Sequence, residues 1–265
     1  MIVHRLQART DNYVWLLHDP ASKEAAVVDP SEAAPVVAAL ERLGARLTAI
    51  WCTHHHYDHV GGNEELCERW PGTVVHGGRV DADEGRIPRL AVSVGDGDEV
   101  TFAGRTARVL FIPGHTRGHV AYVMDGTDGA DGAPRVFCGD TLFGGGCGRL
   151  FEGTPAQMRA SLERLRALPD DTLVHCGHEY TWHNLRWAVE TKLEPSNAAL
   201  AARHARVAVD PTQLTVPTLL GEEKATNPFL RWDVPAIVAS VGASAADAPD
   251  EVFARLRKRK DEWKT

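Results

Sequence analysis

The chain has 265 residues and a formal net charge of −7, with 43% hydrophobic and 25% charged residues. This composition is typical of a globular protein with one large domain, or with a main domain and a smaller one. The negative balance argues against general binding to nucleic acid, and no apolar run is long enough to span a bilayer. The first residues lack the apolar core of a signal peptide, and the five cysteines have no paired spacing, so we expect a cytoplasmic protein.

Up to about residue 175, the hydrophobic pattern predicts strands with interspersed helices. Ser31 is expected to cap a helix that ends near Leu43, and a shorter helix is expected over 63–70. A hairpin is expected around a Gly/Asp-rich loop at 125–134. The predicted strands are 13–17, 24–29, 47–52, 73–76, 90–94, 99–102, 106–112, 121–124, 135–138 and 172–176.

One further helix is predicted before residue 175, and beyond that residue the chain is predicted to be mostly helical. Thr154-Pro155-Ala156-Gln157 is a capping-box signature with proline at the first helical position, and it predicts a helix to about residue 168. The later helices are expected at 181–194, 197–208 and 249–263. We therefore divide the chain into a metal-binding domain, residues 1–175, and a helical substrate-binding domain, residues 176–265.

The densest chemical signal is the heptapeptide Thr-His-His-His-Tyr-Asp-His at 53–59, which follows an apolar stretch and precedes Gly61 and Gly62. On an extended chain His54 and His56 face the same point, while Asp58 and His59 fall at the turn. Neutral imidazole and carboxylate are the usual ligands of zinc and related metals. A terminal tag or a cluster of surface histidines does not account for this internal pattern, so we interpret it as a metal site.

Three further strand ends carry a glycine followed by a polar residue, and each signal is weak alone. Together with the heptapeptide they deliver seven donors: His54, His56, Asp58, His59, His115, Asp140 and His178. Seven donors are too many for one tetrahedral ion and suit two ions that share a ligand. We expect one ion on His54, His56 and His115, and the other on Asp58, His59 and His178. Asp140 is expected to bridge them, because a carboxylate has two oxygens.

Two divalent ions about 3.5 Å apart activate a shared water or hydroxide and stabilise a developing oxyanion, so the implied reaction is hydrolysis. We expect zinc, although iron and manganese accept the same donors. His55 is expected to point away from the ligands, and His119, His175 and His183 are expected to be structural. The cysteines near strand ends are expected to be buried apolar fillers.

These motifs resemble the metallo-β-lactamase superfamily and, within it, the glyoxalase II (hydroxyacylglutathione hydrolase) family. The narrower resemblance covers essentially the whole chain, and it lies in the segments 11–13, 139–143, 146–149, 177–181, 227–231 and 257–261. It implies a four-layer αββα sandwich followed by a C-terminal helical domain. It also implies hydrolysis of S-D-lactoylglutathione to glutathione and D-lactate, the second step of methylglyoxal detoxification, with Asp58 and Asp140 as the catalytic carboxylates.

By the same resemblance, four residues contact glutathione: Arg149, Tyr180, Arg257 and Lys260. A further tyrosine contact of the family is Phe151 here, so one hydroxyl is missing. Independently, Arg257 and Lys260 share a helix face that suits a substrate with two carboxylates. Cations near a helix C-terminus also favour the helix dipole, which is the alternative explanation for them. The partner is expected to be a small thioester, without nucleic acid or membrane, and the protein is expected to be a monomer.

Other functions remain open from the sequence. A persulfide dioxygenase with one iron shares much of the first motif but lacks the basic helical tail, and another thioesterase of the superfamily is a further alternative. A β-lactamase of the superfamily commonly has cysteine where Asp140 stands, and a flavo-diiron reductase has a carboxylate where His56 stands. A ribonuclease conflicts with the acidic balance. A non-catalytic metal-binding protein would not need all seven donors.

Overall fold

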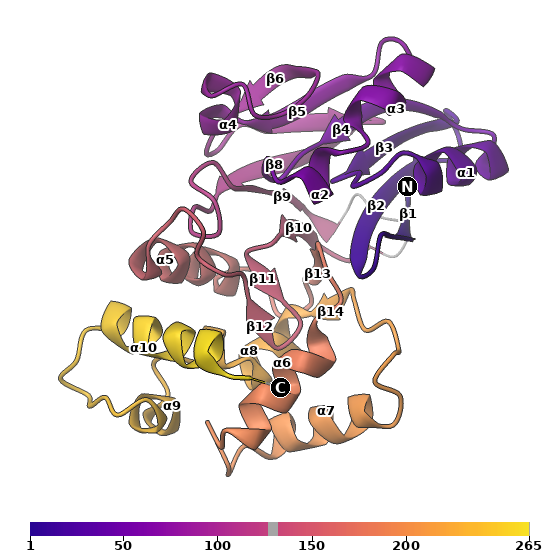
Figure 1. Ribbon diagram of the computed structural model, residues 1–265. Coiled ribbons are helices and arrows are strands. Elements are labelled where there is room, and N and C mark those ends of the chain that lie inside the picture. The colour runs from indigo at the N-terminus through magenta and orange to yellow at the C-terminus, as the bar shows by residue number, and fades with distance from the viewer. Residues whose placement is uncertain (127–131, 265) are drawn as a thin grey trace. The chain divides into compact units, whose positions relative to one another are not determined.

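The computed structural model describes residues 1–126 and 132–264, and its chain forms two compact units (Figure 1). The first unit comprises Met1–Phe111, Arg117–Gly139 and His175–His178. The second comprises Ile112–Thr116, Asp140–Val174 and Glu179–Thr265. Among the helices of the described residues, none is long and apolar enough to cross a membrane.

A six-stranded mixed sheet in the first unit has the strand order β1-β2-β3-β4-β5-β6. β1 to β3 pair antiparallel, and β3 to β6 pair parallel with helices in the connections, as parallel pairing requires. The strands are β1 (Ile2–Ala8), β2 (Asn12–Asp19), β3 (Glu24–Val28), β4 (Arg46–Trp51), β5 (Val74–Gly78) and β6 (Leu90–Val94). The helices are α1 (Ala34–Leu43), α2 (Tyr57–Val60), α3 (Asn63–Arg69) and α4 (Arg79–Asp83).

The hydrophobic core on one face of this sheet joins strand residues to α1 and α3. Val36 and Leu40 of α1 and Leu66 of α3 are fully buried in the same cluster as Leu16 and Ile50. The apolar positions of α1 recur every three or four residues, so one stripe of the helix can be covered by the sheet. This packing fixes the carboxyl ends of β3 and β4, where the first histidines follow.

A second six-stranded sheet has the order β14-β13-β10-β9-β8-β7. Its strands are β7 (Glu99–Phe102), β8 (Arg105–Phe111), β9 (Val120–Met124), β10 (Arg135–Gly139), β13 (Leu173–Cys176) and β14 (Thr218–Leu219). The β9–β10 hairpin forms as predicted, and part of the predicted loop at 125–134 lies outside the described residues.

Within the first unit, the two sheets meet through large buried side chains. The rings of Trp51 on β4 and Tyr122 on β9 stack with centroids 5.2 Å apart. The Tyr122 hydroxyl donates a hydrogen bond to the Cys52 carbonyl (3.0 Å), and the Val120 amide donates to the Thr53 carbonyl (2.8 Å). These bonds tie the start of the His-rich segment to the second sheet.

The second unit is mainly helical. Its elements are β11 (Leu142–Phe143), β12 (Gly146–Cys147), α5 (Pro155–Arg166), α6 (Thr181–Glu190), α7 (Ala198–Ala208), α8 (Leu220–Thr226), the 3₁₀ helix η2 (Pro228–Leu230), α9 (Pro235–Ser240) and α10 (Pro249–Glu262). The predicted capping box at α5 is confirmed: Thr154 Oγ1 accepts from the Gln157 amide, and Gln157 Oε1 accepts from the Thr154 amide. Trp187, Phe229 and Phe253 pack together in its core.

Several local expectations are wrong. Ser31 does not cap α1, because the helix begins at Ala34 and Pro35 stands in its first turn, where a residue without an N–H is accommodated. The buried Ser31 hydroxyl has no hydrogen-bond partner among the described residues. The pattern of the sequence also did not predict several elements that are short or lack a strong periodicity: β1, α4, β11, β12, β14, α8, η2 and α9.

Candidate metal centre and substrate pocket

The heptapeptide at 53–59 is not extended, so the predicted strand geometry is wrong. β4 ends at Trp51, and Asp58 and His59 lie on the short helix α2. His54 and His56 nevertheless face each other, with ring centroids 4.7 Å apart. Gly62 permits this compact turn, because its amide donates to the Pro30 carbonyl (2.8 Å) at a distance that a side chain would obstruct.

A buried carboxylate beneath this turn holds three groups at once. Asp29 is 3% exposed, and its Oδ1 accepts from the Thr53 amide at 2.7 Å. Its Oδ2 accepts from the Thr53 hydroxyl at 2.7 Å and lies 3.1 Å from Nδ1 of His59. Because an ionised carboxylate only accepts hydrogen bonds, Nδ1 of His59 carries the proton and its Nε2 carries the lone pair.

The same network fixes the tautomer of His54. The Thr53 hydroxyl has one proton, and it is used on Asp29, so this oxygen can only accept from Nδ1 of His54 at 3.1 Å. The lone pair of His54 therefore lies on Nε2 as well. Gly139 makes room for the Thr53 hydroxyl, because a Cβ at position 139 would collide with it and the backbone there has φ of 47°. Asp29 thus prepares two imidazoles for metal binding.

A second set of donors surrounds Asp58. Nδ1 of His178 lies 2.8 Å from Asp11 Oδ1, which places the lone pair of His178 on Nε2, 3.5 Å from Asp58 Oδ2. Nε2 of His59 lies 3.8 Å from the same oxygen. The side-chain amide of Asn12 donates to Asp58 Oδ2 at 3.2 Å and to its carbonyl at 3.0 Å, so the carboxylate is held in place.

In the second unit, His115 and Asp140 form a pair. The Arg149 carbonyl accepts from Nδ1 of His115 at 2.9 Å, so the lone pair is on Nε2, which lies 3.4 Å from Asp140 Oδ2. Both side chains are more than nine-tenths buried. Gly148 lets the chain pass close to Asp140, because a Cβ there would collide with the Asp140 carbonyl.

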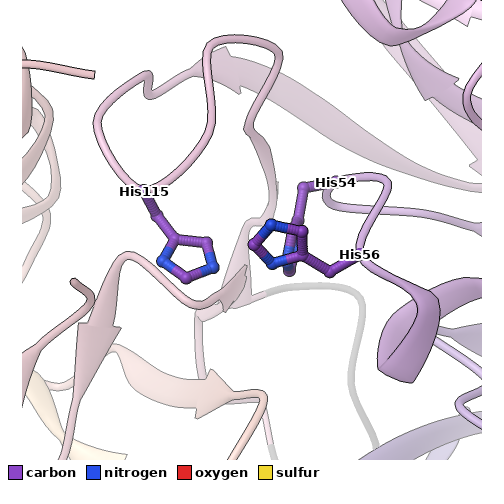
Figure 2. Close-up of side chains that lie close together, drawn as sticks. All are labelled: His54, His56 and His115. Carbon is purple, nitrogen blue, oxygen red and sulfur yellow. The ribbon is translucent and has the colours of Figure 1, made fainter. Parts of the chain in front are cut away.

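Three groups of donors have all their ligand atoms within 4.8 Å of one another. They are His54, His56 and His115; Asp58, His59 and His178; and Asp29, His54 and His59. Figure 2 shows the first group, with the three imidazole rings turned toward a common point. In the third group Asp29 already binds Thr53 and His59, so it acts as an orienting residue. Asp140 belongs to none of these groups and contacts His115.

The other histidines near the motif have structural partners. Nδ1 of His55 lies 2.9 Å from Oδ1 of Asp81, which is fully buried. The ring of His119 stacks on His54 with centroids 4.6 Å apart, and that of His175 meets Trp15 edge-on. The five cysteines are free and all but Cys67 are buried, consistent with their expected role as fillers.

A cavity of about 530 Å³ in the second unit brings the expected substrate contacts together with two expected metal ligands. Its lining includes His115, Asp140, Arg149, Tyr180, Arg257 and Lys260. This volume is typical of sites for small molecules. Phe151, which stands where the family has a tyrosine, also lines the cavity and is 64% exposed.

Of the cationic residues on α10, Arg257 and Lys260 are buried, unlike ordinary surface residues. Arg257 is 4% exposed, and its Nη atoms donate to the Cys147 carbonyl at 3.0 Å and to Asp261 at 2.9 Å. Burial, with the neighbouring charge of Arg257 as the next cause, lowers the pKa of Lys260 to about 7. Placing two cations this close in a cavity favours an anionic ligand.

Three carboxylates that hold the candidate ligands or their neighbours were given no role from the sequence: Asp11, Asp29 and Asp81. Asp29 had a usable signal, because it follows a buried strand directly, as the candidate ligands do. Asp11 stands in segment 11–13 of the family resemblance, which gave it no role, and Asp81 lies within α4, where no strand end marks it.

Comparison with protein families gives two matches that together cover most of the chain. Residues 9–178 match the model of the metallo-beta-lactamase superfamily, and residues 179–263 match that of the hydroxyacylglutathione hydrolase C-terminus. The chain is 52% identical to a hydroxyacylglutathione hydrolase from Microcystis aeruginosa and 54% identical to one from Gloeobacter violaceus. Each alignment covers 99% of this chain and 100% of the relative.

Solved structures show the same fold. ETHE1 from Myxococcus xanthus is 27% identical, with a TM-score of 0.66 over 97% of this chain and 90% of that one. The BLEG-1 B3 metallo-beta-lactamase is 22% identical, with a TM-score of 0.64 over 86% of this chain and 99% of that one, and this likeness concerns the fold alone.

Proposed function

Because the chain belongs to the hydroxyacylglutathione hydrolase family of the metallo-β-lactamase superfamily, we infer that it cleaves S-(2-hydroxyacyl)glutathione to glutathione and a 2-hydroxy acid. It is a thioester hydrolase, as the sequence predicted, and the expected αββα sandwich with a C-terminal helical domain is confirmed. With S-D-lactoylglutathione the products are glutathione and D-lactate, which completes the detoxification of methylglyoxal.

The donor set fits a site for two divalent metal ions. We assign His54, His56 and His115 to one ion and Asp58, His59 and His178 to the other, with Asp140 between them. Hydrogen bonds place the lone pairs of His54, His59, His115 and His178 on Nε2, the state that a metal ligand needs. We propose zinc as the metal, and iron or manganese suits the same nitrogen and oxygen atoms.

Two bound divalent ions would lower the pKa of a shared water and polarise the thioester carbonyl. Asp58 is positioned by Asn12 and would accept the proton of the attacking water at its carboxylate. Asp140 lies with Oδ2 3.4 Å from Nε2 of His115, so its negative charge stands next to that lone pair and favours a cation in the site. The leaving thiol has an ordinary pKa of roughly 8.5, so no dedicated general acid is needed.

The cavity in the second unit carries the proposal for the substrate, because it joins His115 and Asp140 to the cationic residues. Arg149, Arg257 and Lys260 would attract the carboxylates of glutathione, and Tyr180 offers a hydroxyl. Since Phe151 has no hydroxyl to donate, we propose that binding relies on these cations. Two of the five N–H donors of Arg257 bind the Cys147 carbonyl and Asp261, which holds the guanidinium in place, so it offers the substrate its charge and its remaining donors.

We further propose that metal binding resides mainly in residues 1–175 and substrate binding in residues 176–265, although the compact units divide the chain differently around 112–116 and 140–178. We also propose that the protein acts in the cytoplasm as a monomer, without nucleic acid or membrane. The five free cysteines suit a reducing compartment.

The test is hydrolysis kinetics on S-D-lactoylglutathione against other thiol conjugates, with metal content measured on the same sample. We expect about two ions per chain and a preference for the glutathione thioester. One iron per chain, with oxygen consumed on a glutathione persulfide and no thioester cleavage, would favour the persulfide dioxygenase alternative. Cleavage of other thioesters at equal efficiency would exclude glutathione as the selected carrier.

A further inference from the structure

The ammonium group of Lys260 lies between two tryptophans at the end of the substrate cavity. Its Nζ is 4.9 Å from the ring centroid of Trp187 and 4.9 Å from that of Trp263. The ammonium also donates a hydrogen bond to the His183 carbonyl at 3.4 Å. A cation in contact with an aromatic face is stabilised by the ring quadrupole, and Lys260 has two such faces.

The two tryptophans differ in what surrounds them. Trp187 on α6 is fully buried and stacks on Phe229, so it belongs to the core of the second unit. Trp263 follows α10 directly, is half-buried and lines the cavity. Its ring also packs on His183, with centroids 4.9 Å apart, so its position is defined. Trp263 can therefore be changed without opening the core.

Most of the charged groups around Lys260 are cations, which disfavour the charged form of its ammonium group. Arg257 and Asp261 lie on the same helix as Lys260. The buried thiol of Cys147 belongs to β12, and Arg149 follows that strand. From α6, His183 contributes the carbonyl that binds Lys260, while the Arg186 guanidinium lies 5.5 Å from the ring centroid of Trp263 and binds Glu190. Apart from Glu190, which binds Arg186, Asp261 is the only carboxylate among these groups, and it also binds Arg257. The two aromatic faces therefore add to Asp261, Cys147 and the His183 carbonyl as contacts that favour the charged form.

We propose that Trp263 is a specificity-determining residue for this hydrolase: its ring, together with that of Trp187, keeps Lys260 charged in the cavity and so selects thioesters whose thiol carrier bears a carboxylate. The inference rests on the proposed function for its substrate, and it adds a residue outside the glutathione contacts that the sequence indicates. Trp263 acts on the substrate through Lys260 and is therefore a positioning residue.

The decisive comparison is between Trp263→Leu and Trp263→Phe. Leucine keeps an apolar cover over Lys260 but has no aromatic face, whereas phenylalanine keeps both. Burial lowers the pKa of Lys260, so removing one face should lower it further, by about half a unit to one unit. KM should then be about three- to tenfold higher than in the wild type at pH 8, and within about twofold of it at pH 6, where Lys260 is at least half protonated in both proteins.

The experiment measures kcat and KM for S-D-lactoylglutathione between pH 6 and pH 8.5, and binding of glutathione by calorimetry over the same range. We expect kcat to be unchanged, the phenylalanine variant to follow the wild type, and the leucine variant to lose affinity mainly above neutral pH. Trp182→Leu is the matched control, because this tryptophan of α6 stacks on His204 and is not one of the two rings that contact Lys260. This control should leave the dependence of KM and of glutathione affinity on pH unchanged.

A second substrate separates charge selection from packing. For the thioester of glutathione diethyl ester, which lacks both free carboxylates, the leucine variant should raise KM less than for the free acid. Equal losses on both substrates, or equal effects of leucine and phenylalanine, would overturn the inference while leaving the hydrolase function intact. If the wild type does not cleave the thioester, the proposed function fails, and the calorimetric pH profile still tests Lys260 and Trp263.

Discussion

Replacing Asp29 with asparagine should impair metal binding although Asp29 is not itself an assigned ligand. Its carboxylate accepts from the Thr53 amide, the Thr53 hydroxyl and Nδ1 of His59. If the amide nitrogen of asparagine takes the place of Oδ2, a donor replaces the oxygen that now accepts from the Thr53 hydroxyl and from Nδ1 of His59. Nδ1 of His59 must then accept, and the Thr53 hydroxyl must turn its proton to Nδ1 of His54. Both histidines would carry their proton on Nε2, where the metal should bind.

The alternative orientation of asparagine keeps an oxygen at Oδ2 but places its NH₂ group against the Thr53 amide, now 2.7 Å from Oδ1. Two donors then face each other in a site that is 3% exposed, which costs about 1–3 kcal/mol. Loss of one such partner of a metal ligand weakens metal affinity about 10- to 100-fold. Because Asp29 controls one ligand of each assigned ion, we expect about 100-fold weaker binding at both positions, or about 2.7 kcal/mol.

Competition with a chromophoric chelator measures both affinities, and long-range ¹H–¹⁵N NMR spectra of the metal-free protein report the histidine tautomers. Asp11→Asn is the matched control, since Asp11 contacts only His178 among the assigned ligands and its side chain is 38% exposed. Asp11→Asn should weaken the binding of the ion assigned to His178 and leave the tautomers of His54 and His59 unchanged. Wild-type affinity at both positions in Asp29→Asn, with unaltered tautomers, would refute the reasoning.

Three further substitutions test other parts of the site and the fold. Asp140→Ala should remove at least one ion and nearly abolish turnover, as metal analysis and kinetics would show; full occupancy at a normal rate would contradict the assigned bridge. Lys260→Ala should mainly raise KM, and the rise of KM with pH above about 7 should disappear, because the group whose charge is lost there is gone. An unchanged KM would return α10 to a purely structural role. Thr154→Ala should lower the free energy of unfolding by about 1 kcal/mol through loss of the capping box, measured by denaturant titration against the exposed control Thr212→Ala.

The sequence predicted best those features that depend on neighbours along the chain. The capping box at Thr154 and the β9–β10 hairpin follow from local spacing, and both are present. The same locality explains the errors. Ser31 offered a cap, but Pro35 moved the start of α1, and periodicity does not detect strands as short as β14. The chain was expected to be extended at His54 and His56, whereas Gly61 and Gly62, which follow the heptapeptide, let it close into α2.

The residue types of the candidate site were readable from the sequence, because imidazoles and carboxylates after glycines at strand ends are a pattern of composition and spacing. Their protonation was not, since groups distant in the chain bind three of the Nδ1 atoms: Asp29 for His59, Asp11 for His178, and the Arg149 carbonyl for His115. For His54 the distant group is again Asp29, which acts through the Thr53 hydroxyl. Likewise the sequence placed Lys260 on a basic helix face, but only the packing of Trp187 and Trp263 around it decides how strongly it stays charged. Chemical identity is carried residue by residue, whereas tautomer and charge depend on which buried groups the fold brings within hydrogen-bonding or van der Waals distance.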